Sequence, residues 1–300
     1  MSLFRISDFF PKNIIKFDGE FDQLDEAGSI YPGSLCYCQN LQFLDMAMNN
    51  DNVSAIITTE SLLIYAEGGM KAIVVAEDPR HLFFEAYAEI YKNSSLSDIE
   101  CGLGENVDIH PSARISPMSY IGRNVTIGAG VVVGSGVRIM DDVYVDSNAV
   151  IGAEGLLTLR QPQGKLLRIN HAGGVYIGAR SGILSGAVIA KSLFKSPTTI
   201  GEDCQIGIMA NIGHGATIGD QSTISGNTVV AGRVKVGRQV WMGVSSCIAQ
   251  GLTIGDKAHI KMGSVVAHSI PSSATVSGNF AVSHKTHLRQ HFDLKRRENI

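Results

Sequence analysis

The sequence predicts a mainly β protein, in which a left-handed parallel β-helix of hexapeptide repeats follows a small N-terminal α/β domain and precedes a C-terminal helix. Every sixth residue is aliphatic over most of the C-terminal two thirds of the chain. The residue four positions later is small in most repeats, as at Ala113, Ala210 and Ser264. Residues 1–102 lack this period and contain short β-branched runs instead.

The aliphatic period runs from Ile109 to Ile151, from Ile177 to Ile189 and from Ile200 to Val266. A spacing of six matches neither the period of a helix, about 3.6 residues, nor that of a strand, about 2. It matches hexapeptide β-helices, whose coils bury their apolar faces only by stacking on one another. Gly often follows the aliphatic residue, as at Gly122 and Gly207. We expect these glycines to bend the chain or to take a positive φ.

Two interruptions of the period mark loops that leave the β-helix, at 154–174 and at 190–197. Loops inserted into repeat proteins tend to lie on the binding face. We therefore expect an α/β domain over 1–102, a β-helix domain over 103–271 that carries both insertions, and a helical extension over 272–300.

The first domain has the pattern of an α/β unit. Val53 to Thr58 and Ala72 to Ala76 are β-branched runs of the kind found in buried strands. Asp78 followed by Pro79 predicts the N-cap and the first residue of a helix. The sequence thus predicts at least two strands and one helix before the repeats begin.

The composition of the chain bears on its partners, on its compartment and on whether it crosses a membrane. The net charge of −3 gives no general reason to expect a nucleic acid partner. The five cysteines have neither metal-type spacing nor an even disulfide framework, so we expect reduced thiols in a cytoplasmic protein. The N-terminal residues do not have the pattern of a signal peptide, and no run of 18 apolar residues predicts a membrane span.

One histidine of the repeats is a candidate catalytic base. His214 follows the inward Ile212 by two residues, which places it near a corner of the coil and facing outward. Three hexads per coil, as in the left-handed β-helices that the pattern resembles, give a turn of 18 residues and put Gly232 next to His214. A neutral imidazole beside a free backbone N–H is minimal equipment for acyl transfer. The alternative is a solvated surface histidine.

A second histidine, His171, lies in the long insertion and is a possible substrate contact. No other histidine has convergent partners, and we expect no metal site and no nucleotide-binding glycine loop among the repeats.

The chain resembles the UDP-3-O-acylglucosamine N-acyltransferase family, hexapeptide-repeat enzymes that acylate a nucleotide-linked amino sugar in lipid A synthesis, and related N-acyltransferases. The similar segments are GSLCYCQNLQF, LLRINHAGGVYIG, NIGHGATIGDQSTISG and SGNFAVSHKTHLRQ. The resemblance implies that His214 is the active-site base and that Tyr37, Asn40 and Phe43 hold the nucleobase. The alternative for Tyr37 and Phe43 is a place in the core of the first domain. The resemblance also implies a homotrimer, with acyl-CoA or acyl carrier protein as acyl donor and no permanently bound cofactor.

Two positions depart from the family's pattern. Leu184, Ser185 and Gly186 replace its acidic-Arg-Gly motif, and Gly251 stands where it has a second histidine. We therefore expect a different sugar and donor, and a UDP- or dTDP-linked amino sugar of another surface glycan fits as well as lipid A.

Three other functions remain open. An O-acetyltransferase of simple sugars would use the same repeats without needing the first hundred residues. A metal-dependent solenoid of the γ-carbonic anhydrase type would need three converging histidines, and a structural solenoid would need no site. The basic C-terminal residues could dock a carrier protein, bind the phosphates of CoA or only face solvent: Lys285, Arg289, Lys295, Arg296 and Arg297.

Overall fold

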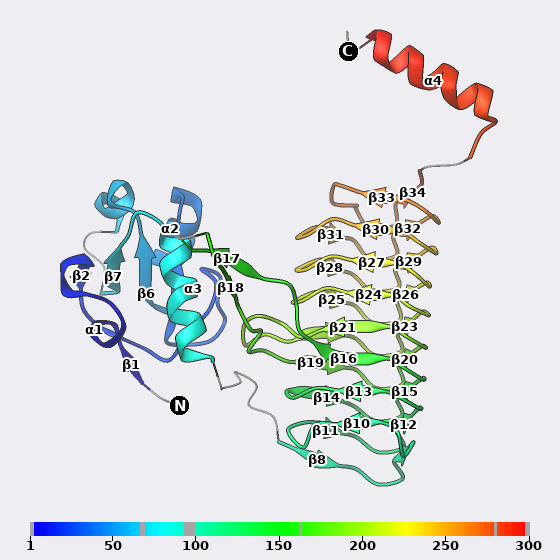
Figure 1. The fold of residues 1–300 in the computed structure, drawn as a ribbon, viewed down its shortest axis with the longest axis horizontal. Helices are drawn as coiled ribbons and strands as arrows, with labels where there is room; N and C mark the ends of the chain where they lie inside the picture. The colour runs from blue at the N-terminus through cyan, green and yellow to red at the C-terminus, as the bar shows by residue number, and fades with distance from the viewer. Residues whose placement is uncertain (1–2, 67–69, 93–99, 162–163, 279–280, 298–300) are drawn as a thin grey trace.

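A stack of coils, an N-terminal domain beside it and a C-terminal helix make up the structure (Figure 1). This computed structural model describes residues 3–66, 70–92, 100–161, 164–278 and 281–297. Along the described chain no helix is long and apolar enough to cross a membrane. The predicted fold class is confirmed, while the exact domain boundaries stay a prediction.

The described coils form three parallel sheets, which we name after one strand of each. The β24 sheet contains β10 (Arg114–Ile115), β13 (Val132–Val133), β16 (Val150–Ala153), β21 (Val188–Ala190), β24 (Asn211–Ile212), β27 (Val229–Val230), β30 (Cys247–Ile248) and β33 (Val265–Val266). The β25 sheet contains β8 (Gly102–Leu103), β11 (Tyr120–Ile121), β14 (Val137–Ile139), β19 (Val175–Ile177), β22 (Thr198–Ile200), β25 (Thr217–Ile218), β28 (Lys235–Val236) and β31 (Thr253–Ile254). The β26 sheet contains β9 (Asp108–Ile109), β12 (Thr126–Ile127), β15 (Tyr144–Val145), β20 (Gly182–Ile183), β23 (Gln205–Ile206), β26 (Thr223–Ile224), β29 (Trp241–Met242), β32 (His259–Ile260) and β34 (Thr275–Val276).

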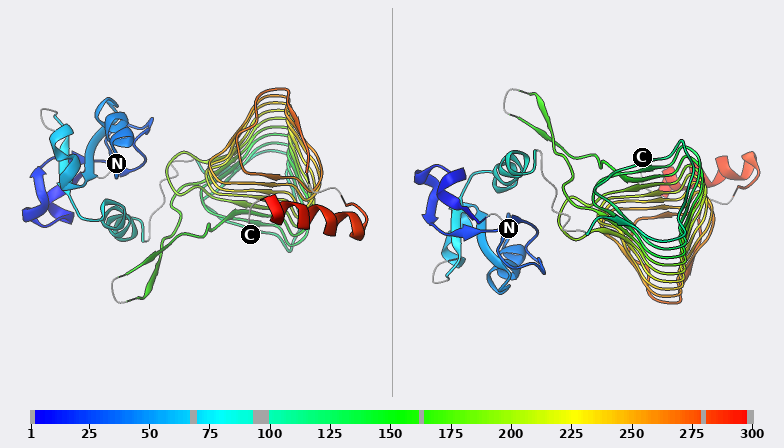
Figure 2. Two further views of the ribbon diagram at one scale, coloured as in Figure 1. Left: turned by 90° about the horizontal axis from the view of Figure 1, so that it is seen from above. Right: turned by 90° about the horizontal axis from the view of Figure 1, so that it is seen from below.

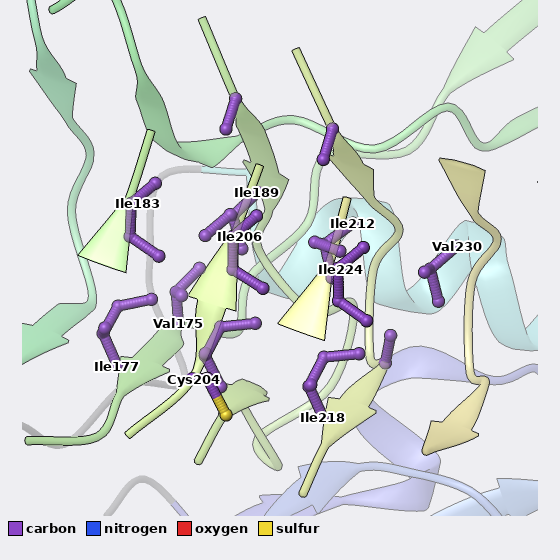
Figure 3. Close-up of a cluster of buried hydrophobic side chains, with 14 of the residues drawn as sticks. Val175, Ile177, Ile183, Ile189, Cys204, Ile206, Ile212, Ile218, Ile224 and Val230 are labelled. Carbon is purple, nitrogen blue, oxygen red and sulfur yellow. The ribbon is translucent and has the colours of Figure 1, made fainter. Parts of the chain in front are cut away.

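The aliphatic residues of the period fill the inside of the solenoid. Ile206, Ile212 and Ile218 come from three different sheets and are fully buried next to one another (Figure 3). Ile109 and Ile115 are only partly buried, because they belong to the first coils of the stack. Each coil thus depends on its neighbours for burial, as expected for a repeat protein.

Most glycines that directly follow the inward aliphatic residue serve close approach, whereas glycines three positions after it, such as Gly130 and Gly215, have a positive φ of 67°. The positive φ falls on the third residue after the inward aliphatic residue, as at Asn124 (56°) and Gln221 (60°). The expected positive φ at Gly122 and Gly207 is therefore wrong. A Cβ on Gly207 would lie 2.5 Å from the backbone nitrogen of Gly226, so no side chain fits between stacked corners.

The N-terminal domain has a five-stranded sheet in the order β2 (Ile15–Phe17), β7 (Ala72–Val75), β6 (Val53–Thr58), β5 (Ser34–Tyr37) and β4 (Gln23–Leu24). β1 (Phe4–Arg5) and β3 (Glu20–Phe21) form a separate pair, and the helices are α1 (Ile6–Phe9), α2 (Leu41–Met48) and α3 (Pro79–Ile90), with 3-10 turns at Lys12–Ile14 and Glu60–Tyr65. Asp78 caps α3 by accepting a hydrogen bond from the His81 N–H. The predicted strands and the start of this helix are confirmed.

The two insertions attach the N-terminal domain to the solenoid. The long one forms the antiparallel hairpin of β17 (Thr158–Arg160) and β18 (Leu166–Arg168), which leaves one corner of the triangular solenoid beside the domain (Figure 2). Phe194 of the short insertion packs against Phe83 and Tyr87 of α3. The Tyr87 hydroxyl donates to the Leu193 carbonyl and accepts from the Ala172 N–H. One hydrophobic core therefore spans the domain and both insertions. The helix α4 (His284–Arg297) follows the last coil.

Candidate active site

The candidate site lies where the chain passes from the β24 sheet to the β25 sheet, which we call the site corner. Both insertions leave the solenoid at this corner, and His214 lies on it between β24 and β25. A cleft of about 280 Å³ separates the site corner from the N-terminal loop that contains Asp25 and Ser29. His214, Gly215 and Arg233 line the cleft on the solenoid side. The structure thus places the predicted base in a cavity between two parts of the chain.

His214 lies directly over Gly232 on the next coil. Strand β24 pairs with β27 at an offset of 18 residues, with Asn211 opposite Val229, which makes His214 and Gly232 corresponding corner residues. A Cβ on Gly232 would come within 2.6 Å of His214 Nε2. The imidazole therefore occupies the space that a side chain at position 232 would need.

The backbone N–H of Gly232, a buried residue on the coil next to His214, is unpaired among the described residues. The amides on either side are bonded, Ala231 to the Ile248 carbonyl and Arg233 to the His214 carbonyl. Among the described residues no hydrogen bond of the Gly232 N–H is found. Gly213 keeps the space beside this N–H clear of a side chain, because a Cβ on it would lie 2.5 Å from that nitrogen. Sequence reasoning placed the base beside this donor, and the structure brings the two together.

His171 also lies at the site corner, but it is buried instead of facing the cleft. Its ring is edge-on to that of His214, with 5.1 Å between centroids. The Glu154 carboxylate accepts from the His171 backbone N–H at 2.9 Å and lies 3.7 Å from His171 Nδ1. Lys191 pairs with the other oxygen of Glu154 at 2.6 Å. Because the His171 side chain is fully buried, it does not touch the cleft directly.

Both imidazoles are held in their neutral form. Burial, together with the nearby His214, lowers the pKa of His171 to about 4. Burial also lowers the pKa of His214, and the positive charge of Arg233 adds to this effect. Burial of Glu154 opposes its ionisation, but the His171 N–H and Lys191 outweigh it and lower the pKa of this carboxyl. At neutral pH the site therefore contains two uncharged imidazoles and one carboxylate bound to a lysine.

The cleft has an acidic wall and a basic wall. Asp25 and Glu26 come from the N-terminal loop, and Arg233 and Lys235 come from the solenoid. Arg233 and Glu26 form an ion pair of 2.8 Å across the cleft. Asp25 is buried, accepts from the Ser29 hydroxyl at 2.7 Å, and has its pKa raised by that burial. The cleft can thus receive a ligand that carries both positive and negative groups.

The predicted nucleobase residues lie in the N-terminal domain, on β5 and at the start of α2. The Tyr37 ring packs against Phe83 and Phe84, with centroids 5.1 and 5.9 Å away. Asn40 caps α2 through its side-chain oxygen, which accepts from the Phe43 N–H at 3.0 Å, and Phe43 is 47% exposed. The cap leaves the Asn40 amide group free to donate, while Tyr37 belongs partly to the domain core. The role of these three residues stays a prediction.

Most charged residues of the site were not singled out from the sequence: Asp25, Glu26, Glu154, Lys191, Arg233 and Lys235. Glu154 and Lys191 each stand at the point where the aliphatic period is interrupted. A charged residue of opposite sign at each interruption was the signal in the sequence that these two side chains could form an ion pair. Arg233 follows Gly232 directly, so the 18-residue offset places it beside His214 as well. Nowhere among the described residues, the candidate site included, do three His, Cys, Asp or Glu residues gather so as to hold a metal ion.

Family models match the solenoid alone. Residues 118–153 and 197–232 match the model described as bacterial transferase hexapeptide (six repeats). Residues 233–267 match the model described as hexapeptide repeat of succinyl-transferase. No curated protein matches the chain.

Several solved structures are similar to this chain. UDP-N-acetylglucosamine acyltransferase from Campylobacter jejuni is 24% identical over 64% of this chain and 78% of that chain, with a TM-score of 0.52. UDP-N-acetylglucosamine O-acyltransferase from Moraxella catarrhalis RH4 is 22% identical over 62% and 76%, with a TM-score of 0.39. A variant of perosamine N-acetyltransferase from Caulobacter crescentus, in complex with CoA and GDP-perosamine, is 19% identical over 74% of each chain, with a TM-score of 0.30. The predicted resemblance is confirmed for the hexapeptide repeats and for their fold.

Proposed function

We propose that this protein transfers an acyl group from a thioester to the amino group of a nucleotide-linked sugar. The observation that carries the proposal is the neutral imidazole of His214 above the free N–H of Gly232, at the edge of a cleft. A general base beside an oxyanion donor is what acyl transfer requires.

The reaction follows from this geometry. The amine nitrogen attacks the thioester carbonyl carbon, and His214 Nε2 accepts the proton that the amine loses. The Gly232 N–H donates a hydrogen bond to the tetrahedral oxyanion. The carbon–sulfur bond then breaks, and the imidazolium returns its proton to the leaving thiolate. The amide and the free thiol are the products, and His214 is again neutral.

The cleft favours an amine over a hydroxyl as the acceptor. Asp25 and Glu26 attract a positively charged amino group to the cleft. The ammonium form gives one proton to solvent before it reacts, and His214 takes the second proton when the free amine attacks. Arg233 and Lys235 suit the phosphates that link a sugar to its nucleotide. A volume of about 280 Å³ suits a sugar ring and leaves the nucleoside outside, toward Tyr37 and Phe43. The similar Campylobacter jejuni structure is a UDP-N-acetylglucosamine acyltransferase, which supports a nucleotide-linked sugar as the acceptor.

The donor in this proposal is acyl-CoA or an acyl carrier protein, which acts as a substrate and not as a bound cofactor. Lys285 and Arg289 of α4 provide positive charge for an acidic carrier or for the phosphates of CoA. The side chains of Lys295, Arg296 and Arg297 lie outside the described residues. We place the reaction in the cytoplasm, where the five free cysteines would stay reduced.

We also propose that the protein is a homotrimer. The corner between the β26 and β24 sheets, which we call the apolar corner, exposes Ile208, Val244 and Met262 by 55%, 45% and 60%. These residues recur at one or two coils' distance and form a stripe along the solenoid. Exposed apolar stripes of this kind typically mark an interface.

Substitutions that introduce negative charges at the apolar corner should dissociate the trimer into monomers. We expect the double variant Val244→Glu/Met262→Glu to sediment as a monomer in analytical ultracentrifugation, because burying two carboxylates in an apolar contact is unfavourable. Lys257→Glu, an exposed change at another corner, is the matched control and should sediment as the wild type does. A wild-type protein that is monomeric at micromolar concentration contradicts the trimer.

Removing the imidazole of His214 should slow turnover strongly while the protein still binds the nucleotide-linked sugar. We expect His214→Ala to lower kcat by about 100-fold to 10,000-fold, the usual contribution of a general base. Thermal shift with UDP- or dTDP-amino sugars should be retained, because the nucleoside binds elsewhere.

The control is His268→Ala, an exposed histidine at the same corner three coils further on. It should keep wild-type kinetics. If His214→Ala were as active as the wild type, the base assignment would fail and the leaving thiolate would remain as the proton acceptor.

The nucleobase contact separates this function from O-acetylation of simple sugars. We expect Tyr37→Leu, which keeps apolar bulk in the domain core, to raise KM for the nucleotide-linked sugar by about 10-fold or more, the loss of one stacked base. Activity toward the free amino sugar should not change. Tyr65→Leu, at an exposed tyrosine of the same domain, is the control. Equal activity of Tyr37→Leu and the wild type on all acceptors would favour the O-acetyltransferase.

A further inference from the structure

His171 is buried in a way that packing alone does not explain. Its side chain has no exposed surface, and among the described residues neither ring nitrogen makes a hydrogen bond of normal distance and angle, although the Ile169 carbonyl is close enough to raise the pKa of the ring. A buried polar atom left without a partner destabilises the folded state, because it loses its hydrogen bonds to water. A residue that only filled space here would be better replaced by a phenylalanine or a leucine. The ring nitrogens are therefore expected to find a partner in some state of the protein.

The surroundings of His171 are shaped to hold an imidazole. Gly155 makes room for it, because a Cβ at that position would overlap His171 Nε2. Gly155 has no positive φ, so close approach is the reason for the glycine. The Glu154 carboxylate lies 3.7 Å from His171 Nδ1, near enough to accept a hydrogen bond after a small rotation of the ring. Lys191 holds that carboxylate from the other side at 2.6 Å.

The neighbour on the remaining side is His214, whose ring centroid is 5.1 Å away. During acyl transfer His214 becomes an imidazolium, and both of its nitrogens then carry hydrogen. Nε2 lies on the Gly232 side, where the substrate binds. The Nδ1–H therefore needs an acceptor elsewhere, and a neutral imidazole can supply one.

We propose that His171 is a positioning residue for His214: it accepts a hydrogen bond from the Nδ1–H of the protonated His214, while Glu154 accepts from the other ring nitrogen of His171. This inference rests on the proposed function for its catalytic meaning. No proton passes to His171 in this scheme. The proton from the amine stays on His214 Nε2 until the thiolate takes it. His171 and Glu154 orient the imidazolium and stabilise its charge, as the carboxylate does in a catalytic triad.

The charged and titratable groups around the pair fix the expected direction of the pH effect. Glu154, Lys191 and His214 face His171, and Arg233 with its partner Glu26 lies beside His214. A hydrogen bond to the charged form of a histidine raises its pKa. Removing His171 should therefore lower the pKa of His214 and move the acid limb of the kcat/KM profile to lower pH. The maximal rate should fall as well, because the imidazolium is less stabilised.

The test compares His171→Phe with the wild type. Phenylalanine keeps a flat ring against His214 but has no nitrogen, so we expect an unchanged or higher Tm. We expect kcat to fall by about 10-fold to 100-fold at pH 7.5, within the range of general-base effects, with an unchanged KM for the acceptor. Glu154→Gln keeps an oxygen for the His171 N–H and removes the charge, and it should change kcat and the acid limb in the same direction. His268→Phe is the control that should match the wild type.

A second measurement does not depend on turnover. Protein with 13C-labelled histidine is titrated by NMR, and the His214 signal is assigned from its loss in His214→Ala. We expect the pKa of His214 to be lower in His171→Phe by about half a unit or more. An unchanged or higher pKa together with wild-type kcat would overturn the proposal. A lower pKa in a protein that has no acyl transfer activity would retain the pairing and reject the proposed function instead.

Discussion

Stacking of each coil directly on the next is the constraint on which the rest of the structure depends. Parallel pairing brings residues one coil apart into contact at every corner and face. At the site corner this places Gly232 under the ring of His214 and Arg233 next to it. At another corner it places Arg123 on Asp141, which the guanidinium contacts at 2.7 Å. The same stacking leaves no room for a Cβ where glycines of neighbouring coils touch, so these glycines are structural, and the unpaired N–H of Gly232 is a consequence of the packing.

The site also requires the insertions, because the solenoid alone would present His214 on an open surface. The register is restored after each insertion, with Ile151 opposite Ile189 and Ile189 opposite Ile212. Each insertion can therefore leave and re-enter at the same corner without disturbing the core. Its apolar residues join the core of the N-terminal domain, which fixes the loop containing Asp25 and Glu26 across from His214. The cleft and the contact between the N-terminal domain and the solenoid therefore both result from the packing of the insertions against this domain.

The parts of the site that obey the period could be predicted from the sequence, and the parts outside it could not. A fixed coil length is enough to make His214 and Gly232 neighbours. No period relates Glu154 to Lys191 or His171 to His214, because their contacts form across loops of different length. For the same reason the sequence made His171 only a possible substrate contact, and its burial places it behind the base. Asn40 shows that one side chain can have a structural role that its spacing does not reveal. The spacing of aromatic residues and an amide suggested recognition of a nucleobase, but the Asn40 amide oxygen also caps α2.

The charges near the two histidines come partly from the solenoid and partly from the insertions. The solenoid contributes Arg233, which discourages protonation of His214. The insertions contribute the Glu154 carboxylate, but its two oxygens already interact with Lys191 and with the His171 N–H. These contacts weaken its tendency to stabilise a protonated histidine. An amine acceptor reacts only as the free base, so a site that must remove its proton needs an uncharged imidazole before reaction and a stabilised imidazolium during it. Burial and Arg233 provide the first, and a neutral His171 held by Glu154 is suited to provide the second.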